Sequence, residues 1–142
     1  MSPVVIVGIL VGLVAFTTVL GLVWKARTGR VRTIRSGAVG GNIVYLPEVP
    51  LDGNATLLQF STEVCAPCVP TRRVLGQIAE STAGVNHVDF DLTHRPDVAA
   101  QFNVLQTPTT LILDRTGAIR ARIGGAPRRA DVVAALETIL AA

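Results

Sequence analysis

The sequence predicts an α/β domain, a small mixed sheet with helices on both faces, preceded by one N-terminal transmembrane helix. The helix is predicted because residues 4–23 form a run of 20 uncharged, mostly apolar residues. The α/β class is predicted because, after residue 54, short apolar segments alternate with segments whose apolar residues recur every three or four positions. These patterns are typical of strands and amphipathic helices in alternation.

The uncharged run is long enough to cross a bilayer. A helix rises about 1.5 Å per residue, so the run extends roughly 30 Å, the thickness of the hydrocarbon core. We expect a single-pass helix over residues 4–24, anchored by Trp24 and followed by Lys25 and Arg27 as a stop-transfer flank. A secretory signal is the alternative, but no Lys or Arg precedes the run, it exceeds a signal core in length, and no A-x-A cleavage site follows.

Cations cluster directly after this run, as Lys25, Arg27, Arg30, Arg32 and Arg35. The other eight arginines share the rest of the chain with all ten acidic residues, for a formal net charge of −2. That balance argues against nucleic acid as a partner, because phosphate binding needs clustered cations on the folded domain. By the positive-inside rule, everything after the helix is cytoplasmic. The lipid bilayer is an expected partner of the five cations.

Two glycines within the predicted membrane helix have the spacing of a helix-pairing motif. Gly8 and Gly12 form G-x-x-x-G, which lets two helices approach closely. Glycine is common in membrane helices, so this spacing predicts only a weak helix–helix dimer.

Residues 25–50 are predicted as a basic juxtamembrane segment and linker, with short extended pieces at 31–34 and 43–46. Residues 51–142 are predicted as the folded domain. Its expected elements are a strand at 56–60, a helix ending near 81, a strand at 88–92, a helix at 96–102, strands at 109–113 and 118–123, and a helix at 130–140. The strand–helix–strand unit predicts a parallel pair, and the hairpin adds antiparallel strands.

The two cysteines of the chain form the motif Cys65-Ala66-Pro67-Cys68, between the first predicted strand and the next helix. Unsatisfied N–H groups and the positive end of the dipole at a helix start favour thiolate over thiol. We expect the pKa of Cys65 to fall from about 8.5 into roughly the 3.5–7.5 range, with Cys68 one turn into the helix. Pro67 fits there because first-turn N–H groups have no intrahelical partner.

This placement predicts thiol–disulfide exchange. The exposed Cys65 thiolate attacks a disulfide in a partner and forms a mixed disulfide, which the less exposed Cys68 then resolves. Cytoplasmic dithiols are kept reduced, so we expect exchange in the reducing direction.

Two other interpretations compete with redox activity. A zinc site would need His87 and His94 as further ligands, but six residues separate them, His87 falls in a predicted strand, and the chain has no second C-x-x-C. We expect no metal, and we interpret both histidines as surface groups. An inert structural disulfide is typical of secreted domains and conflicts with the predicted cytoplasmic side.

Three segments carry a family resemblance: residues 60–68 (FSTEVCAPC), Thr107-Pro108-Thr109 before a strand, and Gly124 at the end of the hairpin. With them, residues from about 51 to 142 resemble the thioredoxin family, and the first fifty residues lie outside the resemblance. More narrowly, the chain is similar to membrane-anchored bacterial thioredoxin-like proteins with a CAPC site.

The resemblance implies a thioredoxin-like fold and a docking groove beside the cysteines. Pro108 would be cis, with Thr107 offering backbone hydrogen bonds to the substrate and Gly124 at the groove edge. Ala66 and Pro67 would support the motif. The implied partners are protein disulfides and a thiol reductant, with no cofactor besides the redox-active disulfide. From the residues alone, Pro108 also fits a plain strand-initiating proline.

Three of the chain's departures from the family pattern lie close to the cysteines or to the strand before them. Val64 stands where the family has Trp, Gln59 where it has a buried Asp, and Asp89 where it has a Lys that pairs with that Asp. A neutral Gln59 cannot act as a general base, so we expect slower activation of Cys68. It also removes a negative charge that would raise the pKa of the cysteines.

These observations lead to one main hypothesis and two alternatives. The main hypothesis is a thiol–disulfide oxidoreductase acting on protein disulfides at the cytoplasmic face of the membrane. The first alternative, motivated by the departures at Gln59 and Asp89, is a tethered binding module that senses redox state with little turnover. The second places the same domain outside the cytoplasm, where it would maintain the thiols of exported proteins.

Overall fold

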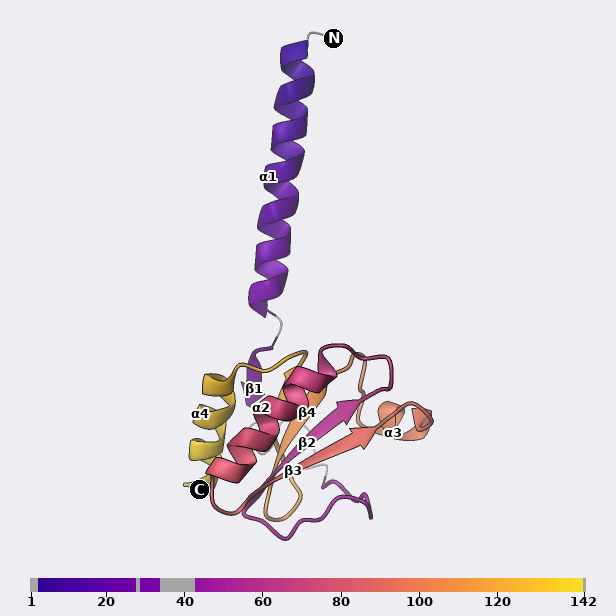
Figure 1. Ribbon diagram of the computed structural model, residues 1–142, viewed down its shortest axis with the longest axis vertical. Coiled ribbons are helices and arrows are strands. Elements are labelled where there is room, and N and C mark those ends of the chain that lie inside the picture. The colour runs from indigo at the N-terminus through magenta and orange to yellow at the C-terminus, as the bar shows by residue number, and fades with distance from the viewer. Residues whose placement is uncertain (1–2, 28, 34–42, 142) are drawn as a thin grey trace.

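A long N-terminal helix stands clear of an α/β domain in the computed structural model, which describes residues 3–27, 29–33 and 43–141 (Figure 1). In this helix, α1 (Pro3–Arg27), residues 3–26 are all exposed. Among the described residues, its segment Pro3–Ala26 alone is long and apolar enough to cross a membrane, with a mean hydropathy of 2.6 and none of it buried. Its length and composition are those of a membrane span or of a signal sequence.

The domain is built on one five-stranded mixed sheet with the order β1-β5-β4-β2-β3. The strands are β1 (Val31–Thr33), β2 (Ala55–Ser61), β3 (Val85–Asp91), β4 (Thr109–Asp114) and β5 (Ile119–Gly124). β2 and β3 are parallel, and the other three pairings are antiparallel. This confirms the parallel pair predicted from the strand–helix–strand unit and the antiparallel hairpin that follows it.

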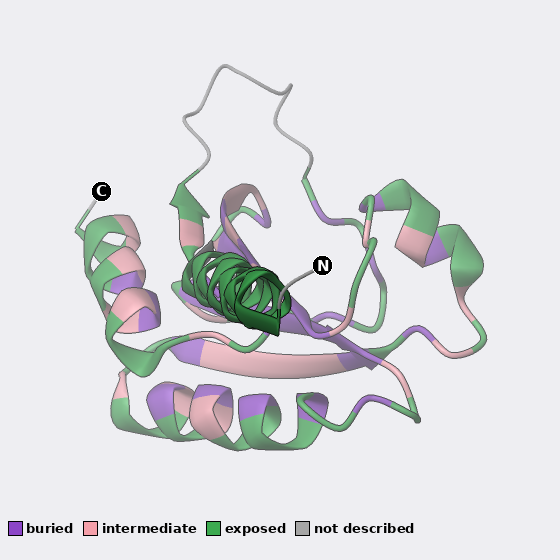
Figure 2. Cartoon of the chain, turned by 90° about the horizontal axis from the view of Figure 1, so that it is seen from above, coloured by how far each residue is buried: buried purple, intermediate pink, exposed green. Residues whose placement is uncertain are grey.

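Helices cover both faces of the sheet, as predicted. They are α2 (Cys68–Ser81), α3 (Pro96–Gln101) and α4 (Arg129–Leu140). On one face, Leu75 of α2 and Leu136 of α4 pack with the sheet residue Leu57. On the other, Val98 of α3 packs with Phe60. Every residue of β2 is buried because this strand lies inside the sheet between the two layers (Figure 2).

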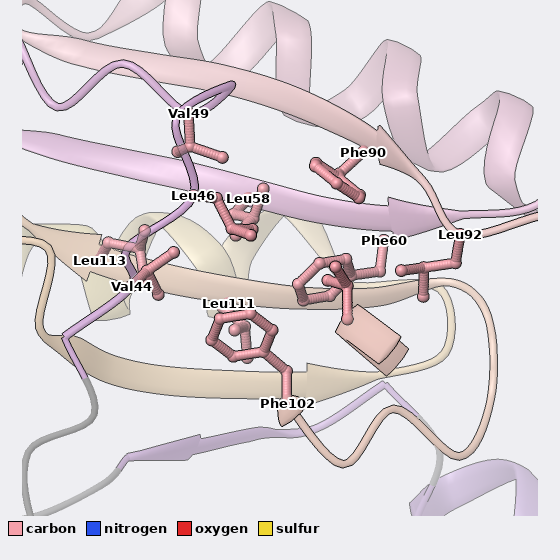
Figure 3. Close-up of a cluster of buried hydrophobic side chains, with 11 residues drawn as sticks. Val44, Leu46, Val49, Leu58, Phe60, Phe90, Leu92, Phe102, Leu111 and Leu113 are labelled. Atoms are coloured by element: carbon pink, nitrogen blue, oxygen red, sulfur yellow. The ribbon is translucent and has the colours of Figure 1, made fainter. Parts of the chain in front are cut away.

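The stretch predicted as a linker contributes to the domain. Its first part forms β1, which pairs with β5, and its last part carries three core residues, Val44, Leu46 and Val49 (Figure 3). Glycine, proline and polar residues make up most of this stretch, and they hide the few apolar residues that find partners on the sheet. Ile34 of the expected extended piece 31–34 and Arg35 of the basic cluster lie outside the described residues.

Candidate active site

The two cysteines lie where the central strand β2 gives way to helix α2. They form a disulfide with their Cα atoms 5.4 Å apart. Cys65 retains 9% of its surface and Cys68 only 2%. Cys65 is therefore the more accessible sulfur, although both are largely covered.

The helix starts later than predicted. Cys68 is the first residue of α2, not one turn inside it, and Cys65 precedes the helix by three residues. A turn joins them, in which the Cys68 N–H donates to the Cys65 carbonyl oxygen at 3.1 Å. The first turn of α2 carries no acidic side chain. The positive end of the helix dipole therefore acts on this pair without a nearby carboxylate in that turn to offset it, and it favours a thiolate after reduction.

A buried polar side chain lies directly beneath the pair. Gln59 is fully buried, and its Nε2 donates to the carbonyl oxygen of Cys68 at 3.1 Å. Its Oε1 lies 3.3 Å from Nε2 of His87, which donates in the tautomer that carries a proton there. Both polar ends of the amide are thus partnered, as a buried side-chain amide requires.

One expectation about this region is wrong. His87 is not a surface group, because it is partly buried on β3 against Gln59. Asp89 instead accepts hydrogen bonds from Ser61 Oγ and from Arg72 Nε, each at 2.7 Å. The register pairs Gln59 with Asp89, yet His87, two residues away and on the same face of β3, reaches Gln59 diagonally.

Burial sets the charge state of His87. It lowers the pKa of the imidazole below the ordinary value of 6.5, Asp89 opposes that effect, and Arg72 adds to it. His87 is therefore mostly neutral at pH 7, and it can hydrogen-bond to Gln59 without placing a positive charge below the cysteines.

The lowered pKa of His87 predicts a loss of stability in acid. The unfolded chain takes up a proton near pH 6.5, whereas the folded chain does so only at lower pH, so the free energy of unfolding should decrease as pH falls below 6.5 through the folded-state pKa. We expect His87→Gln to make this decrease shallower. Denaturant unfolding between pH 7.5 and 5.5 measures it, with exposed His94→Gln as the control. Equal slopes for wild type and His87→Gln would contradict the assignment.

The loop before β4 meets the cysteine loop, as the resemblance implies. The Thr107–Pro108 peptide bond is cis. Thr107 Oγ1 lies 3.3 Å from Thr62 Oγ1, three residues before Cys65. The Gly125 N–H donates to the Pro108 carbonyl oxygen at 2.7 Å, and Gly124 is the register partner of Thr109. The structure thus brings Thr107, Pro108 and Gly124 together, and Thr107 meets the loop that leads to Cys65.

Exposed side chains frame this site. Ala66 and Pro67 lie between the cysteines and are exposed. Val64 is 97% exposed and Leu105 is 87% exposed. Leu105 and Thr62 belong to no motif, so the sequence pattern does not mark them. Val64 directly precedes Cys65, and Leu105 lies two residues before Thr107, so both apolar side chains are close to the site along the chain.

The described residues hold no cluster of three or more His, Cys, Asp or Glu side chains arranged for a metal ion. His87 is hydrogen-bonded to Gln59 on the sheet, whereas His94 lies exposed beyond the end of β3. The structure therefore does not bring the two histidines to the cysteines as a ligand set.

Comparisons with known proteins agree with this geometry. The chain is 28% identical over 81 residues to thioredoxin H2 of Arabidopsis thaliana, covering 57% of this chain and 61% of that protein. It is 32% identical over 73 residues to thioredoxin C-2 of Corynebacterium nephridii, covering 51% of this chain and 68% of that protein. The chain thus spans about 60% of the length of the plant relatives it matches.

Solved structures show the same fold. A chloroplastic thioredoxin z superposes with a TM-score of 0.57 at 25% identity, covering 63% of this chain and 81% of that one. Thioredoxin NaTrxh of Nicotiana alata superposes with a TM-score of 0.53 at 23% identity, covering 61% and 73%. A sequence model of the family named Thioredoxin matches residues 47–138, more than half of the chain. The chain therefore belongs to the thioredoxin family.

Proposed function

We propose that this chain is a membrane-tethered thiol–disulfide oxidoreductase that reduces disulfides in protein partners. The observation that carries the proposal is the Cys65–Cys68 pair at the start of α2, next to the loop of Thr107 and Pro108. Both sulfurs are close enough to bond, and one is more accessible than the other. This is the arrangement that a two-step exchange needs.

The reaction balances without any further redox group. In the dithiol form, the Cys65 thiolate attacks one sulfur of the partner disulfide, a mixed disulfide forms, and the other partner sulfur leaves as a thiolate. The Cys68 thiolate then attacks Cys65 Sγ, which releases the second partner thiolate and forms the Cys65–Cys68 disulfide. Two electrons have passed to the partner, and a thiol reductant returns the pair to the dithiol form.

The surroundings of the pair assign the other roles. The helix dipole favours the thiolates, while Gln59 fixes the Cys68 carbonyl but cannot accept a proton. Thr107, Pro108 and Gly124 form the edge on which a partner segment docks. Exposed Val64 and Leu105 supply apolar contact area beside it.

Reduction of insulin tests the activity. The full-length chain in detergent should accelerate insulin reduction by dithiothreitol well above the rate with dithiothreitol alone, because Cys65 offers a more reactive thiolate than the free reagent at neutral pH. The measurement is the turbidity of the precipitating insulin chains at pH 7. A rate equal to that of dithiothreitol alone would sink the proposal.

A redox sensor with little turnover is the second candidate. It is favoured by Gln59, which replaces a titratable group by a neutral amide directly beneath Cys68. In that case the oxidised and reduced chains would differ in partner binding, while insulin reduction would stay near background. The same turbidity assay therefore distinguishes the two functions.

We propose further that α1 spans the membrane and that the domain is cytoplasmic, since cations follow the helix in the sequence. We expect a green fluorescent protein fused after Ala142 to fluoresce in bacterial cells, and an alkaline phosphatase fused there to stay inactive. Phosphatase activity together with a dark fluorescent fusion would instead place the domain outside. Pairing of two chains through Gly8 and Gly12, which are both exposed on α1, remains part of the proposal.

A further inference from the structure

A basic pocket lies where the end of α1 meets the domain. Its volume is about 530 Å³, and it is lined by Trp24, Arg30, Arg32, Asn103, Leu105, Gln106, Thr109, Arg122 and Gly124. Three of these residues are arginines and none is acidic. The pocket therefore favours an anion.

The arginines of the pocket have no carboxylate partner in the part of the chain that the structure describes. There, Arg30, Arg32 and Arg122 form no salt bridge. Arg32 and Arg122 are direct register partners on β1 and β5, and like charges directly opposite each other repel. An anion between them would remove that repulsion.

One of the arginines is held in place for such an anion. The Arg122 guanidinium donates from Nη1 to the Phe102 carbonyl oxygen at 2.8 Å and from Nη2 to that of Asn103 at 2.6 Å. A guanidinium has five N–H donors, so others are left to bind an anion. Arginine matches phosphate oxygens in planar, bidentate geometry.

The connection between α1 and the domain is very short. α1 ends at Arg27, and the Gly29 N–H already donates to the Gly124 carbonyl oxygen at 2.9 Å. Gly29 has a φ of 80°, and a Cβ there would collide with the Ala126 carbonyl oxygen, so the chain is closely seated at this point. Two residues of extended chain cover at most about 7 Å. If α1 spans a bilayer, the pocket lies at the level of the lipid headgroups.

We propose that this pocket binds the phosphate of an anionic phospholipid headgroup. The inference rests on the proposed membrane span of α1. The bound lipid would hold the arginine-bearing strands β1 and β5 of the domain close to the membrane. α1 leaves the domain at the end where β2 stops and α2 begins (Figure 1), so the cysteines would face substrates close to the bilayer.

Native mass spectrometry of the full-length chain in detergent tests the proposal, with phosphatidylglycerol, phosphatidylcholine and inorganic phosphate as separate probes. We expect one phosphatidylglycerol per chain, and much weaker binding of the other two. The double variant Arg30→Gln/Arg32→Gln should weaken phosphatidylglycerol binding roughly 30-fold, since each arginine near a lipid surface contributes about a factor of five. Arg30→Lys/Arg32→Lys keeps both charges and should retain most of the affinity.

The matched control removes two exposed arginines elsewhere, Arg73→Gln/Arg115→Gln, and should bind the lipid as the wild type does. Equal binding of phosphatidylglycerol by Arg30→Gln/Arg32→Gln and by Arg73→Gln/Arg115→Gln would overturn the proposal. Binding of phosphatidylcholine or inorganic phosphate as tight as that of phosphatidylglycerol would overturn it too. Lipid binding without insulin reduction would contradict only the proposed oxidoreductase activity. Insulin reduction without lipid binding would contradict only the proposed lipid site.

Discussion

A Cys68→Ser variant is expected to stop at the mixed disulfide and to lose turnover. Cys65, the more accessible sulfur, can still attack a partner disulfide, but the thiol that releases the partner is gone. We expect about one covalently attached partner per chain and insulin reduction at the background rate. Non-reducing electrophoresis and mass spectrometry detect the adduct, and dithiothreitol should reduce its disulfide bond and release the partner.

Cys65→Ser is the matched variant for that experiment. It should also lose turnover, but it should accumulate no adduct, because Cys68 retains only 2% of its surface and has Gln59 beneath it. An adduct that forms on Cys65→Ser and is missing from Cys68→Ser would exchange the roles of the two sulfurs. Turnover that survives in either variant would rule out the two-step exchange.

Phe60→Ala is expected to destabilise the domain strongly. The Phe60 side chain is fully buried, and its ring centroid lies 5.6 Å from that of Phe102 and 6.1 Å from that of Phe90 (Figure 3). Truncating a buried Phe to Ala costs about 3–5 kcal/mol, set against a typical domain stability of roughly 5–15 kcal/mol. Denaturant unfolding of the full-length chain, followed by circular dichroism at pH 7.5, measures the loss.

Tyr45→Ala is the control for this substitution. Tyr45 is 79% exposed, although its neighbours Val44 and Leu46 are buried. The substitution therefore removes an aromatic ring without opening a cavity. We expect its free energy of unfolding to stay within about 0.5 kcal/mol of the wild type. A similar loss for Tyr45→Ala and Phe60→Ala would mean that Phe60 is not central to the folded core.

Local patterns in the sequence were enough to predict the order of the elements and the chemistry. Helix α2 was recognisable because Thr71, Leu75 and Ile78 recur at helical spacing, and all three are buried. The C-x-x-C motif stood out because the chain has no other cysteine. Each of these two patterns is formed by residues that lie close together in the chain, so the spacing of the residues is enough to recognise it.

Contacts between distant segments were beyond such patterns. Val44 and Leu46 belong to the core, and His87 reaches Gln59, only because the tertiary fold places them there. Helix α2 also begins later than the pattern predicts, since Ala66 and Pro67 stay in the turn before it.

The α/β class, the reactive pair and the order of the elements from residue 55 onward all follow from residues that are neighbours in the chain. Tertiary packing selects the side chain that supports Cys68 and the arginines that face each other near the end of α1. Strand register brings Gln59 to His87 and Arg32 to Arg122. Register depends on how segments far apart in the chain pack together, and no local periodicity encodes it.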